Sequence, residues 1–334
     1  MDKPKPVGVV TVTYNSGTVI RDFVASLLKQ SHTNFILYAV DNASSDETLG
    51  LLADYRDPRV LIIPNSENLG VAEGNNIGIR AALRDGCASV LLINNDTVID
   101  SDVISRLLNG LEQYHCDMIV PKILYFDPSD TVWCAGGAFS PLRGAARHFG
   151  FGQKDDGKFD QPREVQYSPT CCMLIKKGVF ERIGLMDAKY FVYFDDTDFC
   201  LRARRAGMKL VYLPTARVYH KVSSLIGHRS DLHLRYFTRN HVYYVMKNFR
   251  PWMILYYLPI CQAHVFRRCL IAKNKAQAFF LAEKAFWEGF ALSYSEPNPT
   301  ELVPRTAWGP LPPTAHDGPG VPQSIPVDGD DKSH

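Results

Sequence analysis

The stretch VLLINNDTVI, residues 90–99, decides how the rest of the sequence is interpreted. It opens with a short apolar run without alternation, approached from Ser89, which is typical of a strand covered on both faces in a parallel sheet. The run ends in Asn94-Asn95-Asp96-Thr97, and in open α/β sheets ligands bind just beyond the carboxyl ends of the strands. Carboxylate and carbonyl oxygens are the ligands that a hard divalent cation prefers, often together with phosphates. The alternative interpretation is a plain turn, with Asp100 or Ser101 capping the next helix.

Strands and helices alternate along the first part of the chain. Helical spacing of apolar residues predicts helices between short apolar runs, and residues 64–74 are expected to form a polar loop before a helix over 75–83. This alternation favours an α/β fold with a Rossmann-like, mostly parallel sheet and right-handed crossovers. The apolar runs that predict strands are residues 7–12, 35–40, 60–63, 90–93, 118–124, 167–175 and 210–213.

Bulk composition limits the classes of protein that fit. The chain has 334 residues, 46% hydrophobic and 22% charged, which suffices for a substantial core. A net charge of +2 gives no basic field for nucleic acid. The eight cysteines include no CxxC pair, so a reducing compartment is expected instead of a zinc site or a secreted disulfide framework. We expect a cytoplasmic protein, because the first apolar run fits a strand better than a signal peptide and no window approaches the ~20 apolar residues of a membrane span.

The loop after the first strand reads Thr13-Tyr14-Asn15-Ser16 and lacks a G-x-G-x-x-G pattern. Its absence disfavours the pyrophosphate turn of nicotinamide and flavin proteins. A nucleotidyltransferase of related architecture would also need a glycine-rich loop with Arg or Lys at this place. Asp41, at the end of the second strand, is a candidate to hold a ribose hydroxyl. A plain polar turn is the alternative interpretation of the first loop.

A second dense constellation lies at residues 193–207, YFDDTDFCLRARRAG. It predicts a helix that begins near Asp196 and stops at a glycine, with acids and arginines placed as the helix dipole favours. Asp198 and Arg202 can pair at i,i+4. These structural reasons do not explain three carboxylates within four residues, because like charges so close need a cation or a buried proton. The later His220 is a lone histidine, which is more often a structural residue than a ligand.

The chain becomes helical, aromatic and basic from residue 232 onward. Between residues 235 and 290 it has nine Lys and Arg against two Glu. Two interpretations stay open, namely helices docked on an anionic membrane surface and a helical cap with a solvated basic face. We expect this extension to span 231–295. From residue 296 to 334, nine prolines in 39 residues predict a disordered tail.

Several segments, taken in order, resemble the family 2 glycosyltransferases, which have the GT-A nucleotide-sugar-binding fold. Within that family the chain is most similar to the rhamnosyltransferase-type bacterial enzymes that build cell-surface polysaccharide. The similarity runs over about residues 7–250. Each segment alone is weak evidence, whereas the ordered set is specific. The segments are VVTVTYNS, VDNASSDET, ENLGVAEGNNIGI, LLINNDT, YFVYFDDTDFCLRARRAG and VYHKVSS.

The resemblance implies a GT-A domain over residues 1–230, with a donor half at 1–125 and an acceptor half at 126–230. The segment ending in Asp96 takes the place of the family's D-x-D metal motif, and His220 falls on a histidine that completes the Mg²⁺ or Mn²⁺ site in similar enzymes. Asn94 departs from that motif and leaves one charge fewer on the metal. The residues implied to hold a nucleoside diphosphate sugar are Thr13, Tyr14, Asn15, Asp41, Asn68, Gly70, Asn75, Asn94 and Asn95.

The family's acidic motif falls on Asp195-Asp196, with Asp196 in the position of the general base. The implied reaction is inverting and metal-dependent, and its acceptor is a hydroxyl of a cell-surface glycan or a polyprenyl-linked molecule. No Q-x-x-R-W motif follows, which favours a non-processive enzyme. Docking of the basic segment would place the protein on the inner face of the plasma membrane. The alternative is a non-catalytic sugar- or partner-binding scaffold that retains the fold, for which Asn94 is the support.

Overall fold

The computed structural model describes residues 5–140, 142–222, 230–272 and 274–295. The expected disordered tail at 296–334 lies outside the described residues. Strands alternate with helices through the first part of the chain, as the apolar runs predict. The strands are β1 (Val7–Thr13), β2 (Phe35–Asp41), β3 (Val60–Pro64), β4 (Ser89–Ile93), β5 (Thr97–Ile99), β6 (Met118–Tyr125), β7 (Thr131–Cys134), β8 (Gly137–Ser140), β9 (Ala145–His148), β10 (Gln153–Lys154), β11 (Arg163–Val165), β12 (Cys172–Lys176) and β13 (Leu210–His220).

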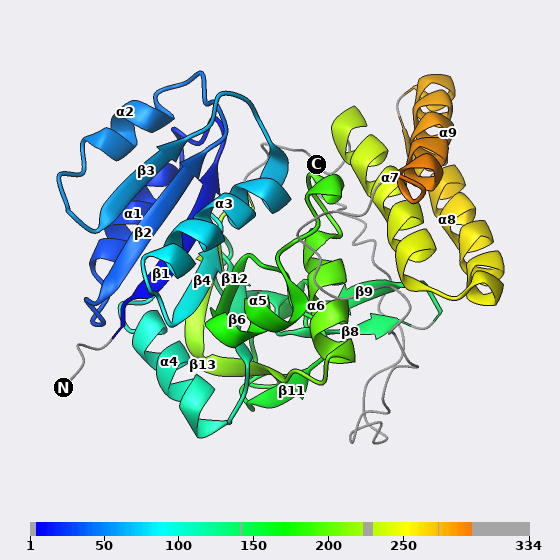
Figure 1. Ribbon diagram of the computed structural model, residues 1–334. Coiled ribbons are helices and arrows are strands. Elements are labelled where there is room, and N and C mark those ends of the chain that lie inside the picture. Colours follow the sequence, from blue (N-terminus) through cyan, green and yellow to red (C-terminus); the bar gives the residue numbers. More distant parts are fainter. Residues whose placement is uncertain (1–4, 141, 223–229, 273, 296–334) are drawn as a thin grey trace.

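Helices flank the sheet, and the last three stand side by side at one side of it, as Figure 1 shows. Among the described helices, none combines the length and the apolar character that crossing a membrane requires. The helices are α1 (Ile20–Leu28), α2 (Thr48–Ala53), α3 (Gly70–Arg84), α4 (Val103–Gln113), α5 (Lys177–Ile183), the 3₁₀ turn η1 (Ala188–Tyr190), α6 (Asp195–Arg205), α7 (Asp231–Asn248), α8 (Pro251–Ile271) and α9 (Lys275–Leu292).

A mixed sheet with the strand order β10-β7-β6-β12-β4-β1-β2-β3 forms the centre of the molecule. The strands β1 to β4 pair in parallel, as expected. β12 instead runs antiparallel to β4, with Cys172 opposite Ile93. β12 therefore begins where β4 ends, and there the backbone N–H of Asn94 donates to the carbonyl oxygen of Cys171 at 2.9 Å.

Some boundaries differ from the sequence-based predictions for physical reasons. α3 begins at Gly70 and not within the range 75–83, because the Asn68 side chain accepts a hydrogen bond from the Gly70 N–H at 2.9 Å and stabilises an earlier first turn. Thr97, expected in a turn, begins β5 because β13 supplies a pairing partner, with His220 opposite it. Such pairing between distant segments carries no local sequence signal.

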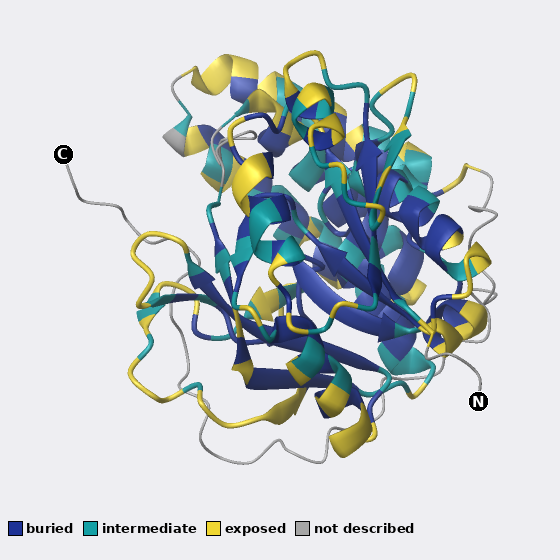
Figure 2. Cartoon of the chain, turned by 90° about the vertical axis from the view of Figure 1, so that its left-hand side faces the viewer, coloured by how far each residue is buried: buried dark blue, intermediate teal, exposed yellow. Residues whose placement is uncertain are grey.

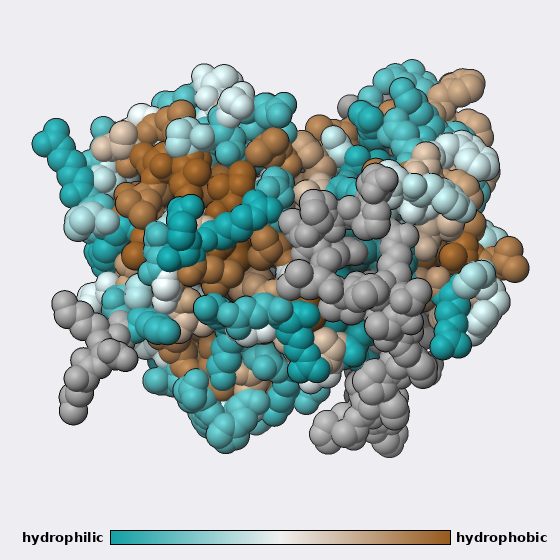
Figure 3. Space-filling view, viewed as in Figure 1, coloured by the Kyte–Doolittle hydropathy of each residue, from teal (hydrophilic) through white to brown (hydrophobic). Residues whose placement is uncertain are grey.

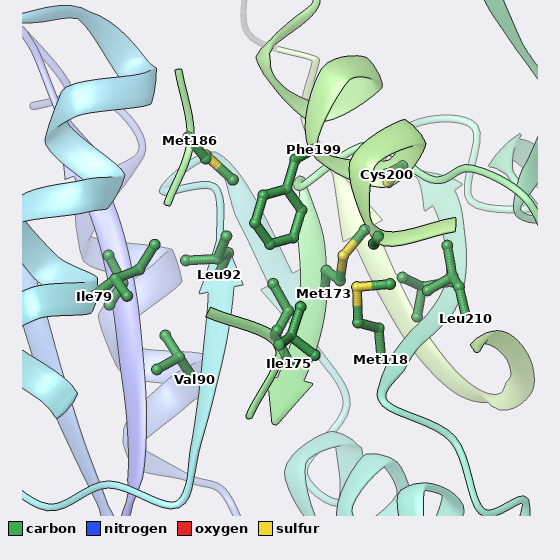
Figure 4. Packing of buried hydrophobic residues seen from close by; sticks show 14 of the residues in the cluster. Ile79, Val90, Leu92, Met118, Met173, Ile175, Met186, Phe199, Cys200 and Leu210 are labelled. Atoms are coloured by element: carbon green, nitrogen blue, oxygen red, sulfur yellow. The ribbon is translucent and has the colours of Figure 1, made fainter. Parts of the chain in front are cut away.

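The hydrophobic core occupies both faces of the sheet. One cluster packs β4, β12 and β6 against α3 and α6, and Figure 4 shows Leu92, Met173 and Phe199 meeting there. A second cluster packs the opposite face against α1 and α4. Figure 2 shows the strands as the buried centre, with exposed residues on loops and outer helix faces. Burial on both faces is what the unbroken apolar runs predict.

A buried group of charges attaches α7 to α6. The Nζ atom of Lys247 lies 2.7 Å from Asp187 and 3.0 Å from Asp198, and Arg202 pairs with Asp198 at 2.8 Å. Burial alone would raise the pKa of Asp198, but the charges of Lys247 and Arg202 hold it well below its usual range. The predicted i,i+4 pair is confirmed, whereas Lys247 does not belong to a solvated basic face.

Two glycines allow α3 to pack closely on β1. A Cβ atom added at Gly78 would lie 2.3 Å from a side-chain carbon of Val10, and one added at Gly74 would lie 2.7 Å from Val12. Gly50, on the exposed surface of α2, differs because such an atom would meet nothing within 4 Å. Close approach, and not backbone conformation, therefore explains the two glycines of α3.

Alanine should act in opposite directions at these positions. Gly50→Ala is expected to raise the free energy of unfolding by up to ~1 kcal/mol, because alanine loses less backbone entropy in a helix. Gly78→Ala should lower it by about 1–3 kcal/mol, because the added methyl group overpacks the contact with Val10. Urea unfolding followed by circular dichroism measures both changes. Equal midpoints for the two variants would contradict the close packing of α3 on β1.

Candidate active site

The ends of β1 and β2 bring a buried carboxylate and its donors together. The Thr13 hydroxyl donates to Asp41 at 2.7 Å, and Ser44 donates to the same carboxylate through its N–H at 2.9 Å and its hydroxyl at 2.6 Å. Asp41 is fully buried. Its oxygens therefore hold the loops after β1 and β2 together instead of facing solvent.

Tyr14 and Asn15 continue the first loop with different exposure. The Tyr14 side chain is 47% exposed. Asn15 has a φ of 49°, a left-handed conformation that asparagine tolerates. Its Oδ1 atom accepts a hydrogen bond from the Ser45 N–H at 2.8 Å, and its own N–H donates to Ser44 at 2.9 Å. Tyr14 thus presents an aromatic ring beside a loop that Asn15 makes rigid.

A further polar group lies at the start of α3. The Asn42 side chain donates to the Gly70 carbonyl oxygen at 3.0 Å and to Asn68 Oδ1 at 3.3 Å. Asn75 is buried, and its amide lies 3.7 Å from the sulfur atom of Met186. The structure therefore brings Asn68 and Gly70 together, while Asn75 packs toward the segment before α6. Asn42 is not among the site residues predicted from the sequence, although it directly follows Asp41 at a strand end.

Asn94 and Asn95 directly follow β4. The Asn95 amide donates to the Val12 carbonyl oxygen at 2.5 Å, which ties the end of β4 to β1. The Asn94 carbonyl oxygen accepts a hydrogen bond from the Thr97 hydroxyl at 2.7 Å. The Thr97 contact is that of a turn, whereas the Asn95 contact joins two strands.

Asp96 and His220 form a pair although they are far apart in the sequence. Asp96 Oδ1 lies 3.1 Å from His220 Nε2, because β13 pairs with β5 and places His220 beside the end of β4. Within the described part of the chain, the buried Nδ1 atom of His220 has no hydrogen-bond partner. That part of the chain also has no group of three or more His, Cys, Asp or Glu side chains that could hold a metal. At this place the described residues bring together one carboxylate and one imidazole.

Asp195 and Asp196 begin α6 in different environments. Asp196 accepts hydrogen bonds from the Tyr167 hydroxyl at 3.0 Å and from the Thr197 N–H and hydroxyl at 2.6 and 3.1 Å. Burial raises the pKa of Asp196, and these hydrogen bonds oppose the rise. Burial and then the charge of Asp196 raise the pKa of Asp195 to about 8. Hydrogen bonds to its carboxylate therefore favour the ionised form of Asp196, whereas burial and the neighbouring charge favour the protonated form of Asp195.

A row of aromatic rings connects the Asp96–His220 pair to the Asp195–Asp196 pair. The Tyr167 hydroxyl lies 3.5 Å from His148 Nε2, and Trp133 packs edge-on against His148 and His220 with ring centroids 5.0 and 4.5 Å apart. Burial lowers the pKa of His148 to about 4, so its ring is neutral. Tyr167 and His148 are not among the site residues predicted from the sequence. The aromatic, glycine-rich segment around Trp133 was the available signal.

Comparisons with curated proteins identify relatives that act on sugars. A family model described as glycosyl transferase family 2 matches residues 8–184. The low-salt glycan biosynthesis hexosyltransferase Agl10 of Haloferax volcanii is 28% identical to this chain. The match covers 61% of this chain and 63% of the length of that relative. The dTDP-rhamnosyl transferase RfbF of Shigella flexneri is 25% identical, with 73% and 81% of the two chains covered. An N-acetylglucosaminyl-diphospho-decaprenol L-rhamnosyltransferase of Mycobacterium tuberculosis is 26% identical, with 68% and 79% covered.

Solved structures with low sequence identity share the fold. The mannosyltransferase PcManGT from Pyrobaculum calidifontis, in complex with GDP-Man and Mn²⁺, has a TM-score of 0.53 at 16% identity, covering 87% of this chain and 76% of that one. GalNAc-T7 with UDP, GalNAc and Mn²⁺ has a TM-score of 0.59 at 14% identity, covering 87% and 57%. The predicted GT-A fold with C-terminal helices is therefore confirmed. Because the family model covers more than half of its length, this chain belongs to glycosyl transferase family 2.

Proposed function

We propose that this protein transfers a sugar from a nucleoside diphosphate sugar to a hydroxyl group of a cell-surface glycan or a lipid-linked acceptor. The transfer is non-processive and inverts the anomeric centre. The observation that carries the proposal is the arrangement of the Asp96–His220 pair and the Asp195–Asp196 pair at two ends of one aromatic row. The names of the Shigella and mycobacterial relatives support rhamnose as the sugar and a polyprenyl-linked acceptor.

Asp96 and His220 would hold a Mg²⁺ or Mn²⁺ ion. A carboxylate suits either ion, and the phosphate oxygens of a donor can supply the remaining ligands. When bound, such an ion offsets the charge that develops on the leaving diphosphate. Asn94 replaces an acid of the usual motif, so we expect weaker metal affinity than a D-x-D segment gives. In this proposal the donor lies over residues 1–125, where Tyr14 offers an exposed ring.

Asp196 is the proposed general base. Three hydrogen bonds stabilise its ionised form, whereas the proton on Asp195 prevents that residue from accepting another. A carboxylate beside the acceptor hydroxyl removes its proton as the oxygen attacks the anomeric carbon. A single displacement inverts the anomeric centre, so no covalent intermediate forms. The acceptor would be bound within 126–230.

A panel of nucleotide sugars tests this function. dTDP-rhamnose, UDP-sugars and GDP-sugars, each with Mn²⁺ or Mg²⁺, are compared by thermal shift and then by donor hydrolysis. Stabilisation that requires both the metal and the nucleotide sugar, followed by slow hydrolysis of the same donor, supports the proposal. Neither stabilisation nor hydrolysis with any donor would leave a non-catalytic scaffold as the better explanation.

The outer surface of α8 and α9 is apolar. The inner side of α8 packs on α7 and α9 through residues such as Tyr257 and Val265, yet its outer side is apolar too. A helix that is apolar on all sides is normally covered. Figure 3 shows brown residues at the outer edge of this helix pair. The exposed side chains include Trp252 (66%), Leu255 (77%), Tyr256, Phe266 and Leu270 on α8 and Phe280 and Trp287 on α9.

Many basic residues of the extension make contacts inside the protein. Besides the buried Lys247, Arg235 pairs with Glu288 at 3.2 Å, and Arg268 lies 4.1 Å over the ring of Phe237. The solvated basic face is therefore smaller than the nine-to-two charge ratio predicts. Basic side chains that remain exposed include Arg250, Arg267, Lys275 and Lys284, and Arg235 is exposed despite its ion pair.

We propose that the outer face of α8 and α9 lies in the interface of an anionic bilayer. Tryptophan and tyrosine favour the boundary between headgroups and acyl chains, and the exposed Arg250, Lys275 and Lys284 complement anionic headgroups. Burial of apolar side chains would then contribute more to the free energy of membrane binding than the basic side chains do. This surface would keep the enzyme at the membrane that carries a lipid-linked acceptor.

Asp96→Ala is expected to abolish the increase in nucleotide affinity that a metal gives, because the ion loses its charged ligand. Calorimetry with dTDP in the presence and absence of Mn²⁺ measures this difference. His220→Ala should weaken the same binding less, since a neutral ligand is lost. Asp130→Ala, on an exposed loop, is the control. Unchanged Mn²⁺-dependent affinity in folded Asp96→Ala would contradict the metal assignment.

Asp196→Asn should keep donor and metal affinity near wild type while turnover falls by ~10²-fold or more, because the shape is retained and the base is lost. Asp195→Asn should lower turnover less, because the raised pKa of Asp195 already favours its protonated form. Burial raises the pKa of Asp196, so wild-type kcat/KM should decline as pH falls through a value above the usual carboxyl range, where the base becomes protonated.

Steady-state kinetics over a pH series, with calorimetry of dTDP binding, measure these effects. The assignment would be overturned by near-normal transfer in Asp196→Asn, above all if Asp195→Asn is folded and inactive. If kcat/KM of Asp196→Asn still declines over the same acidic pH range as in wild type, another group controls that decline.

The membrane surface is tested by liposome flotation. Wild type is expected to float with vesicles that contain anionic lipid, and the double variant Leu255→Ser/Phe280→Ser should lose at least about half of the floated fraction, because each change removes one to a few kcal/mol of apolar burial. Leu61→Ser, at an exposed position of β3, is the matched control. Wild type that remains in the bottom fraction would contradict the membrane proposal and leave these helices as a structural cap only.

A further inference from the structure

The segment directly before the acid pair has a rare backbone conformation. Phe191, Tyr193 and Phe194 have φ values of 64°, 66° and 68°. Bulky L-residues seldom adopt this left-handed conformation, and each instance costs about 1–3 kcal/mol. Such a segment persists only where its surroundings hold it in place. Asp195 and Asp196 follow immediately, so the segment determines where α6 begins.

Asn240 of α7 holds this segment from one side. It is fully buried, and its Nδ2 atom lies 2.8, 2.6 and 2.9 Å from the carbonyl oxygens of Tyr190, Val192 and Tyr193. Its Oδ1 atom accepts a hydrogen bond from Arg239 Nε at 2.8 Å, which orients the amide group toward the carbonyl oxygens. The two hydrogens of one amide group are therefore shared among three backbone acceptors within four residues.

Arg239 adds to the same set of contacts. Its guanidinium donates to the carbonyl oxygens of Lys189 and Tyr190, both at 2.8 Å. α9 supports this part of α7 closely, because a Cβ atom added at Gly289 would lie 2.1 Å from the Arg239 carbonyl oxygen. Within the helical extension, the close contact between Gly289 and Arg239 leaves no room for a side chain at position 289.

α3 holds the segment from the other side. The Val71 N–H donates to the Phe191 carbonyl oxygen at 2.6 Å. Gly70 has a φ of 79°, and a Cβ atom there would lie 2.5 Å from Phe191. The segment is therefore fixed between the start of α3, which carries the proposed donor residues Asn68 and Gly70, and Asn240 of α7.

We propose that Asn240 is a positioning residue for the reaction. It keeps the segment from Phe191 to Phe194 in its strained conformation, and this conformation aims the Asp196 carboxylate at the acceptor. The inference rests on the proposed function, because it takes Asp196 as the base. It also assigns a part in catalysis to α7, which lies outside the residues 8–184 matched by the family model.

Asn240→Ala is compared with Asn248→Ala to test this role. Asn248 is a buried asparagine of the same helix. Its amide donates to Asp198 at 2.9 Å and its Oδ1 atom accepts from Arg205 at 3.3 Å, so its loss removes two hydrogen bonds of α7, neither of them to a carbonyl oxygen of the strained segment. Asn240→Ala is expected to lower kcat by about 10²-fold, the usual effect of a misplaced catalytic group, with dTDP affinity within about 3-fold of wild type. Asn248→Ala should keep kcat within about 3-fold at a similar loss of thermal stability.

A double variant separates positioning from stability. If Asn240 acts through Asp196, Asn240→Ala should have little further effect on the residual donor hydrolysis of Asp196→Asn. Donor hydrolysis is measured with the panel member that wild type uses, beginning with dTDP-rhamnose. An undiminished effect in that background, or equal kcat for Asn240→Ala and Asn248→Ala, would overturn the positioning role.

Two further results separate the positioning role of Asn240 from the assignment of Asp196 as the base. Near-normal turnover of Asp196→Asn would refute the base assignment itself, whatever Asn240→Ala does. If Asn240→Ala does not fold, Arg239→Lys takes its place, because lysine keeps the charge but cannot reach two carbonyl oxygens with a planar fork. Arg239→Lys should lower kcat in the same direction by a smaller factor, and an unchanged kcat would count against the inference.

Discussion

The parallel pairing of β1 with β2 and β4 is the constraint on which the site depends. Parallel strands end at the same edge of a sheet, so polar residues that are distant in sequence become neighbours. The register places Thr13 opposite Asp41, which allows the 2.7 Å hydrogen bond between them. A slip of one residue would turn Asp41 to the other face of the sheet. Backbone hydrogen bonds far from any ligand therefore determine where the polar loops lie.

The same constraint explains what could be predicted from the sequence. Unbroken apolar runs identify β1 to β4, and the polar residues that follow them, such as Asp41 and Asp96, mark the edge where a ligand would bind. The Asp96–His220 contact depends on β13 pairing with β5, and local pattern carries no information on that pairing. Lys247 looks like a surface charge in the sequence, yet it is buried because Asp187 and Asp198 converge on it from another element.

Two adjacent carboxyl groups acquire different properties because their surroundings differ. Composition cannot separate Asp195 from Asp196, since both precede the same helix. The Tyr167 hydroxyl donates to Asp196, while Asp195 is more deeply buried and its pKa rises to about 8. Tyr167 comes from the segment before β12 and meets α6 only in the folded chain. The different environments of these two carboxyl groups are thus a property of the tertiary structure.

The strained segment before Asp195 connects the acid pair to the helical extension. Three left-handed aromatic residues at about 1–3 kcal/mol each are opposed by the hydrogen bonds of Asn240 and Arg239, worth about 1 kcal/mol each. Those donors reach four carbonyl oxygens of the segment, those of Lys189, Tyr190, Val192 and Tyr193. The total backbone strain and the total hydrogen-bond contribution are similar in size. Displacing α7 would therefore leave the strained conformation without the interactions that offset its strain. The inner face of the extension therefore packs on the segment that precedes the acid pair, and the proposed membrane surface lies on the outer face of α8 and α9.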